Sequence, residues 1–546
     1  MPWILFRHFL AELTKVLFLT TAIIVVVVAF GAVIKPLTGN LLGPGGILKY
    51  IFLAMVPMLQ YALPFAAGFA ATIVTHRFAS DNEIQAMSVS GISYRVILLP
   101  QIVLGIVLTI FMFFLVQTLI PRFLGKMDDV IAHDAAEVFV NTIRSGESFL
   151  AGSYLISADR VALVEDFPDS SLQRVRMERV VAIEVDGNGR LITEFVARSG
   201  SADLYSSQSD LIVKVAFRDA TIMRPGESTL AFAKLIEPVP NVIPVGWERS
   251  PKYLPWSELL AVYRDPSKGA LVEDVRRKYQ PSIAAAILMD QLSKQIAATG
   301  TGLLVSEEAD RSYEIRDAML GGTGLIPVPP AKKITLIERQ GTLALREASA
   351  VGAQLLATAD AALSPQSNRL DLIVPEAKAR DLRSSGDRAV RWPTRIVGLS
   401  VGSGTVEHVP SLQESIEQAR SIAAQTTPPL NAYSAAATTF IASIEKGIVD
   451  TKHEALSHLV MRFAQPISVA LMLLLGGILA IWRRDSLPLT VFLLAFLPAL
   501  ANVLMIASGQ GIVRSGKVVS GLTVMWMGSL IFLVLIVGIG RRMARR

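Results

Sequence analysis

The sequence predicts a helical membrane protein with six spans, arranged as three plus three around a large inserted domain. Six segments lack Asp, Glu, Lys and Arg: Val16–Ile34, Tyr50–Val74, Val96–Ile120, Phe463–Trp482, Ser486–Ser508 and Val518–Gly540. Each approaches or exceeds the roughly 20 residues that a helix needs to cross a hydrocarbon core. Because backbone groups in lipid must satisfy their own hydrogen bonds, these segments are expected to be helices.

Composition supports this fold class. Hydrophobic residues make up 52% of the 546 residues, and 18% are charged; the mean hydropathy of +0.48 is too apolar for a soluble globular protein. The net charge of +6 comes without a basic stripe of interleaved aromatics, so no nucleic-acid partner is predicted. The absence of cysteine excludes disulfides and thiol catalysis. No A-x-A cleavage site follows the first span, which is therefore kept, with Met1–Lys15 as a lead-in along the membrane surface.

The charges of the short loops predict the orientation. Six spans place both termini on one side, and the short segments of that side hold ten Lys or Arg: Arg7, Lys15, Arg77, Arg95, Arg483, Arg484, Arg541, Arg542, Arg545 and Arg546. The opposite short loops hold only Lys35, Lys49, Arg514 and Lys517. The positive-inside rule therefore predicts cytoplasmic termini and an outer domain over about Pro121–His458.

The outer domain has two parts with different sequence patterns. Residues 121–237 are expected to form an antiparallel β-domain of sandwich or jelly-roll type, because apolar residues alternate around the hairpin signal Asp186–Gly189. Residues 238–450 are expected to form an additional mixed module. Within it Trp256–Thr299 has helical spacing with a break at Gly269, while Gly300–Pro429 permits no assignment. Residues 1–120 and 451–546 hold the two sets of three spans.

Glycines and prolines inside the spans suggest close helix contacts and kinks. Gly31 and the pair Gly476-Gly477 would allow neighbouring helices to approach closely, although glycine is common in membrane helices for other reasons. Pro57 and Pro64 in the second span free backbone carbonyls and permit bending.

The loop between the second and third spans holds the strongest local signal. Ser80 and Glu83 have the spacing of a capping box, Asp81 adds negative charge to the first turn, and Gly91 fits the position after the last turn. A short cytoplasmic helix is therefore expected over Asp81–Ser90. Its apolar pair, Ile84 and Met87, would either dock into a groove of a partner or rest on lipid, and the spacing leaves both open.

This loop also resembles a known family. Residues 77–93 follow the pattern R-x-x-x-D-x-E-I-x-A-M-x-x-x-G-I-S, which is similar to the cytoplasmic loop of the LptF/LptG permeases. Arg462, Ala464 and Pro466 resemble a second family pattern, E-x-x-x-R-x-A-x-P, with His458 where that pattern has Glu. The resemblance covers about Met1–Glu237 and His453–Arg546, so the segment of about Pro238–Asp450 departs from the family layout.

The resemblance implies a function in lipid export. Such a chain is the permease subunit of an ABC machine that extracts lipopolysaccharide from the inner membrane. Its partners would be a cytoplasmic ATPase dimer similar to LptB, a second LptF/LptG-like subunit, and periplasmic bridge proteins similar to LptC and LptA.

The resemblance also implies roles for particular residues. Glu83 would be the carboxylate that meets the ATPase, with Ile84 and Met87 as apolar anchors in a helix framed by Ser80, Asp81 and Gly91. The phosphates of the lipid head group would require cations at the outer ends of the spans, and that depth is occupied by Lys35, Arg462, Arg514 and Lys517. Anchoring of the helices by snorkelling is the alternative for these four.

No catalytic or cofactor motif appears in the sequence. Gly511–Val518 is one residue short of a phosphate-binding loop and lacks its Ser or Thr, so ATP is expected to bind a separate subunit. His453 and His458 are five residues apart and would diverge on a helix, which argues against a metal site. Two other readings remain: a membrane-anchored scaffold without transport, and a membrane enzyme with its site in Gly300–Pro429.

Overall fold

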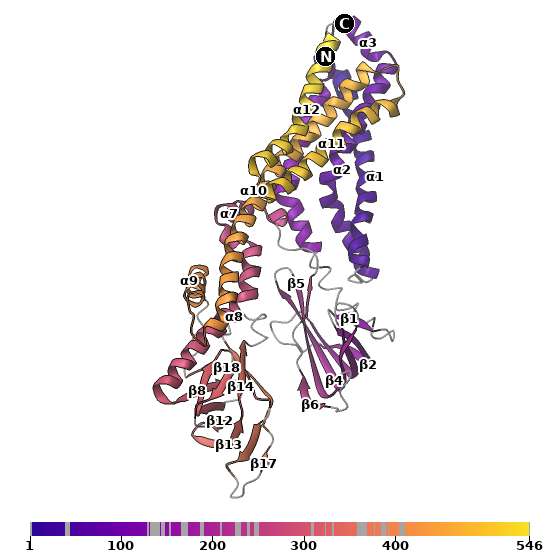
Figure 1. The fold of residues 1–546 in the computed structure, drawn as a ribbon. Helices are drawn as coiled ribbons and strands as arrows, with labels where there is room; N and C mark the ends of the chain where they lie inside the picture. Colours follow the sequence, from indigo (N-terminus) through magenta and orange to yellow (C-terminus); the bar gives the residue numbers. More distant parts are fainter. Residues whose placement is uncertain are drawn as a thin grey trace. The chain divides into compact units, whose positions relative to one another are not determined.

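A computed structural model of the chain consists of two compact units, Met1–Pro266 with Asp450–Arg546, and Ser267–Val449 (Figure 1). The structure describes residues 3–544 except 39–43, 128–129, 131–141, 143–147, 152–153, 165–172, 186–189, 208–209, 224–230, 237–240, 245–250, 307–310, 323, 330–331, 358–368, 376, 384–388, 391 and 403–409.

The six predicted spans are confirmed as helices long and apolar enough to cross a membrane. They are α1 (Trp3–Thr38), α2 (Pro44–Ser80), α5 (Leu99–Phe114), α10 (Asn431–Trp482), α11 (Pro488–Arg514) and α12 (Val518–Ala544). The third span continues from α5 through a π-helical turn, η1 (Leu115–Leu119), to Met127. Two short helices, α3 (Glu83–Val89) and α4 (Tyr94–Ile97), connect the second span to the third.

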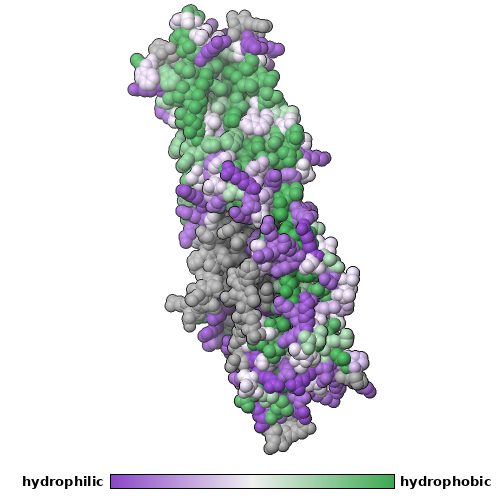
Figure 2. Space-filling model, turned by 90° about the vertical axis from the view of Figure 1, so that its left-hand side faces the viewer, coloured by the Kyte–Doolittle hydropathy of each residue, from purple (hydrophilic) through white to green (hydrophobic). Residues whose placement is uncertain are grey.

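The helix bundle has an apolar interior, with small residues along α2, and an apolar exterior. Its largest cluster of buried side chains contains Ala66, Ala67, Ala70 and Ala71 of α2, together with residues of α1, α5 and α10. Large apolar side chains point outward on the same helices, among them Phe18, Ile23 and Phe30 of α1 and Leu489, Leu493 and Leu497 of α11. The resulting green belt over the bundle in Figure 2 is what contact with lipid requires.

The start of the chain differs from the prediction. Met1–Lys15 was expected to form a separate lead-in on the membrane surface, but α1 is continuous from Trp3. No Gly or Pro interrupts residues 3–15, and Phe9 and Leu13 are fully buried against the bundle. The lead-in is therefore the first part of the first span's own helix.

The expected β-domain after the third span is present in the first unit. Its strands are β1 (Phe149–Ala151), β2 (Tyr154–Val164), β3 (Gln173–Val185), β4 (Leu191–Ser207), β5 (Asp210–Met223), β6 (Ala231–Ile236) and β7 (Asn241–Pro244). They form one antiparallel sheet in the order β1 to β6, with β7 beside β5. The hairpin signal at Asp186–Gly189 lies outside the described residues, but Val185 pairs with Leu191 across it. The inner face buries Val175, Met177 and Phe217.

Helical spacing was correctly assigned over Trp256–Thr299. A 3₁₀ turn, η2 (Pro251–Tyr253), precedes α7 (Trp256–Arg264); a second, η3 (Pro266–Lys268), leads into α8 (Ala270–Thr299), whose N-cap is the predicted break, Gly269. The first unit includes α7, because Leu259 packs against Ala455 and Leu459 of α10. The second unit begins at Ser267. The sequence pattern of the outer domain changes earlier, near Pro238.

The segment that the sequence left unassigned is mainly a β-sheet. Its strands are β8 (Thr301–Ser306), β9 (Arg311–Arg316), β10 (Ala318–Gly321), β11 (Gly324–Pro327), β12 (Ile334–Gln340), β13 (Leu343–Ala350), β14 (Ala353–Ala357), β15 (Leu370–Ile373), β16 (Ala377–Asp381), β17 (Ala389–Val390) and β18 (Arg395–Val401). The strand order is β10-β11-β14-β15-β18-β8-β9-β12-β13-β16-β17. Leu288, Met289 and Leu292 of α8 share its core. The other side of α8 packs with α9 (Leu412–Ala423) and with Phe440 and Ile444 of α10.

Candidate functional site

The short helix α3 lies at the end of the bundle that also holds both chain termini (Figure 1). Phe9 near the N-terminus, Met543 near the C-terminus, and Ile84 of α3 belong to one apolar cluster. Asn82 takes the left-handed conformation at φ 58° before α3, and Gly91 takes it at φ +83° after α3. Asn and Gly tolerate this conformation best, so these two residues set the limits of the helix. The expected role of Gly91 is confirmed.

The expected capping box is wrong. Ser80 is the last residue of α2, and its hydroxyl contacts Nδ1 of His76 at 3.1 Å, one turn earlier. Asn82 is the N-cap of α3, with no side-chain hydrogen bond to the helix. Asp81 is exposed in the turn between α2 and α3. The expected helix Asp81–Ser90 is therefore shorter by two residues at its start, because a side-chain partner inside α2 holds Ser80.

The apolar face of α3 is turned toward the bundle. Ile84 and Met87 are buried, and both belong to the cluster formed by α1, α2, α5 and α10. These two side chains pack α3 against the membrane helices of the same chain. They were expected to be the apolar anchors for a partner, and this burial corrects that expectation. Glu83, Gln85 and Ala86 are exposed, and Val89 retains 84% of its surface.

The turn between α10 and α11 contacts the α3 region. His76 Nε2 lies 2.7 Å from the carbonyl oxygen of Ser486. Arg484 donates to the side-chain oxygen of Gln85 at 2.8 Å. The sequence did not reveal these two contacts, since no local pattern relates positions about 400 residues apart.

At the other end of the bundle, Arg462 faces inward. Its side chain is buried, and its guanidinium donates to the carbonyl oxygen of Leu254 at 2.6 Å and to Gln117 in η1 at 3.3 Å. It therefore joins the third and fourth spans to the segment before α7. A head-group phosphate was expected to bind Arg462, but its charge is directed at protein oxygens within a closed contact.

The remaining predicted head-group cations have different surroundings. Arg514 donates to Nε2 of the buried His458 at 2.7 Å and pairs with Glu454 at 3.1 Å. Its side chain is still 44% exposed, and Lys517 in the same turn is exposed. Lys35 belongs to α1, and its side chain lies outside what the structure describes. Arg514 and Lys517 are thus the described cations of the set with surface left for a ligand.

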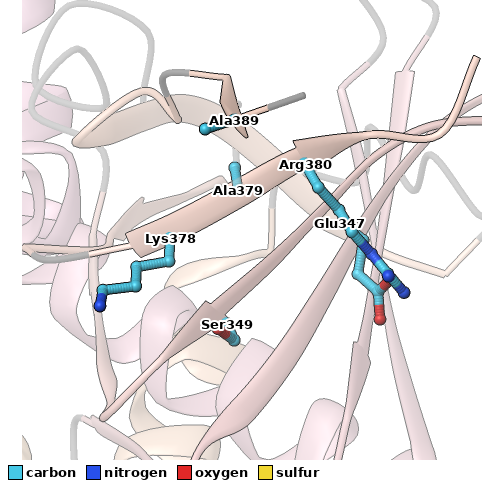
Figure 3. Close-up of a pocket in the computed structure, with 6 residues that line it drawn as sticks. All are labelled: Glu347, Ser349, Lys378, Ala379, Arg380 and Ala389. Carbon is cyan, nitrogen blue, oxygen red and sulfur yellow. The ribbon is translucent and has the colours of Figure 1, made fainter. Parts of the chain in front are cut away.

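No metal site emerges from the part of the chain that the structure describes, where no three His, Cys, Asp or Glu side chains gather suitably. A shallow cavity of about 360 Å³ lies in the second unit beside β13, β16 and β17 (Figure 3). Arg380 and Glu347 face one another there, with the guanidinium on the carboxylate, while Lys378 extends away from them. The charge of Arg380 is therefore paired with that of Glu347.

Six membrane helices interrupted by β-sheet units, with a short helix between the second and third spans, define a multi-pass membrane protein. Residues 3–289, more than half of the chain, match the family of the lipopolysaccharide export system permease LptF/LptG, and the chain belongs to this family. A comparison with curated protein sequences finds no match. The protein is thus an inner-membrane permease subunit of the lipopolysaccharide export system, distinct from its nucleotide-binding subunit.

The matched range adds to the resemblance found in the sequence. It includes α7 and most of α8, which lie beyond Glu237, and it ends at Met289 before the sheet β8–β18 and the last three spans.

Proposed function

We propose that this chain supplies one half of a lipid-extracting permease whose movement is driven by a separate ATPase dimer similar to LptB. A second LptF/LptG-like subunit would complete the cavity, and bridge proteins similar to LptC and LptA would receive lipopolysaccharide outside. In this arrangement α3 and both termini are cytoplasmic, and the sheets β1–β7 and β8–β18 are periplasmic.

The main support for the proposal is that α3 is packed against the membrane helices on one side and exposed on the other. Its buried face, Ile84 and Met87, fixes it to the membrane helices, while Glu83 and Val89 remain free on its outer surface. A helix held in this way can transmit a force from a partner to the bundle. Glu83 would supply the charge that orients the partner, and Val89 would supply the apolar contact.

For the lipid, the proposal narrows the expected head-group site. Arg514 and Lys517 have exposed surface in the turn between α11 and α12, at the end of the bundle away from α3. A guanidinium and an ammonium suit phosphate oxygens. Lys35 remains a predicted contributor, whereas Arg462 is assigned to holding the spans together.

Glu83→Arg tests the coupling contact. Charge reversal at the centre of the interface should reduce copurification of the ATPase at least about tenfold, because the partner then meets a like charge. Asp485→Arg is the matched control: this carboxylate lies in the α10–α11 turn at the same end of the bundle and its side chain is 95% exposed. Equal ATPase association in Glu83→Arg and the parent would refute the coupling role.

A membrane-anchored scaffold without transport is the remaining alternative, and the large second unit gives it a surface for partners. The two functions differ in one measurement on the reconstituted complex. A permease releases lipopolysaccharide in proportion to ATP hydrolysed, and lipid stimulates its ATPase; a scaffold shows neither effect.

A further inference from the structure

We infer that the turn between α10 and α11, residues 483–487, receives the movement of α3, and that His76 is the positioning residue that joins them. The inference rests on the proposed function, because it concerns how a push on α3 spreads through the chain. The covalent links of α3 run only to α2 and, through α4, to α5. Without non-covalent contacts to the second set of spans, a push on α3 would act directly on the first set alone.

His76 forms a defined, partly buried link between the two sets of spans. The residue itself is 5% exposed. The carbonyl oxygen of Ser486 can only accept a hydrogen bond, so Nε2 carries the proton and donates across the 2.7 Å contact. Nδ1 of the same ring faces the Ser80 hydroxyl at 3.1 Å, one turn further along α2. Ser80 therefore fixes the ring that reaches the second half of the chain.

Backbone hydrogen bonds connect the receiving turn to the helices on both sides. Its backbone closes on itself through Ser486 N–H to the Arg483 carbonyl at 3.0 Å, and Arg483 N–H continues the α10 ladder to Leu479 at 2.9 Å. On the far side Thr490 N–H bonds to the Leu487 carbonyl at 2.9 Å, which starts α11. A displacement of the Ser486 carbonyl is therefore passed to the ends of both α10 and α11.

Two further contacts support the same path. Ile481, two residues before the receiving turn, shares an apolar cluster with Ile84 and Met87 of α3. Arg484 reaches Gln85 on α3 at 2.8 Å. The Arg484 contact is exposed and competes with water, whereas the His76 contact is partly buried, so His76 is the member whose loss should matter most.

The test uses the reconstituted full complex with its ATPase, in vesicles containing lipopolysaccharide. His76→Leu removes the donor, and His76→Gln places an amide N–H near the position of Nε2. The lipid released per ATP hydrolysed should fall about fivefold in His76→Leu, with ATPase copurification unchanged, and His76→Gln should recover most of it. Arg484→Ala should give a smaller loss than His76→Leu. Arg541→Ala, at an exposed arginine near the end of α12 and outside the receiving turn, is the matched control and should behave like the parent.

Each outcome bears on the inference separately from the proposed function. A folded His76→Leu protein with the parent's ratio of lipid to ATP would overturn the inference, as would equal losses in His76→Leu and His76→Gln, which would indicate packing alone. The proposed function is tested by a different experiment, and it would fail if Glu83→Arg bound the ATPase as well as the parent does. Loss of association in Glu83→Arg with full coupling in His76→Leu would refute only the relay through His76.

Discussion

At the residue scale, Gln101 of α5 packs closely on Gly477 of α10. Gln101 is fully buried and donates from Nε2 to the Thr75 hydroxyl of α2 at 2.5 Å. A Cβ built at Gly477 would overlap the Gln101 amide. At the adjacent Gly476 a Cβ would come within 2.7 Å of the Gly68 carbonyl oxygen of α2. The absence of side chains at 476 and 477 therefore lets three helices from both halves of the chain meet.

Gly477→Ala should destabilise the bundle. The new methyl group has to displace a buried amide that already holds Thr75, and overpacking of this kind costs about 1–3 kcal/mol. Gly31→Ala is the control, because a Cβ at Gly31 meets nothing within 4 Å and alanine favours a helix over glycine by up to about 1 kcal/mol. Thermal unfolding in detergent should show a lower midpoint for the first variant and an unchanged or higher midpoint for the second. Equal midpoints in both would contradict the contact.

The glycines of the spans also show what the sequence can predict about single residues. Gly31, Gly476 and Gly477 all suggested close helix contacts, yet the structure places a neighbour only at Gly476 and Gly477. Arg462 shows the same limit, since its position gives its depth in the membrane but not the Leu254 carbonyl and Gln117 that enclose it. The position of a residue within an apolar segment indicates its depth in the membrane. Its contacts depend on how the helices pair, which the local sequence does not encode.

At the element scale, a proline in α2 and a glutamine in α10 form a complementary pair. Pro64 has no N–H, so the Gln60 carbonyl four residues earlier loses its partner within the helix. Gln465 of α10 supplies the missing donor, with its Nε2 at 3.1 Å from the Gln60 oxygen. The bend that Pro64 permits is thereby tied to the fourth span, and α2 is the same helix that holds His76 and Ser80 at its end.

Gln465→Leu should leave the Gln60 carbonyl without this donor and cost about 1–3 kcal/mol of stability. In a Pro64→Ala background the restored N–H can bond to that carbonyl, so the cost of Gln465→Leu should fall below about 1 kcal/mol. The four proteins of this double-mutant cycle are compared by unfolding midpoint in one detergent. Additive effects of the two substitutions would show that Gln465 and Pro64 are not coupled.

Elements were predictable where one physical requirement dominates. The six spans follow from the length of apolar chain that lipid demands, and all six were found. The short helix after α2 was predicted from a capping box and from Gly91, and of these two signals the structure retains Gly91. The spacing of Ile84 and Met87 left a partner and lipid both open, because periodicity identifies a face and not what covers it. The capping box failed since His76 competes for Ser80. The sheet β8–β18 escaped prediction because its strands are short and separated by irregular spacings.

At the scale of the whole molecule, the proposed machine depends on which membrane face each part occupies. The helix α3 follows two spans, and the second unit follows three. If every span crosses the bilayer, these parts must lie on opposite faces. The contacts agree at the α3 end, where residues near both termini share its apolar cluster. The excess of Lys and Arg in the loops of that end predicts that it is cytoplasmic.

The absence of cysteine makes this arrangement directly testable. Single cysteines at Ser90, exposed at the end of α3, and at Leu343, 70% exposed in the second unit, introduce one thiol each. A maleimide that cannot cross membranes should label Leu343→Cys in intact spheroplasts, but Ser90→Cys only after lysis. The parent chain gives the background, because it has no thiol to react. Labelling of both positions from the same side would contradict the proposed transport path. Either α3 would then lie on a different face of the membrane from the cytoplasmic ATPase, or the sheets would not lie in the periplasm.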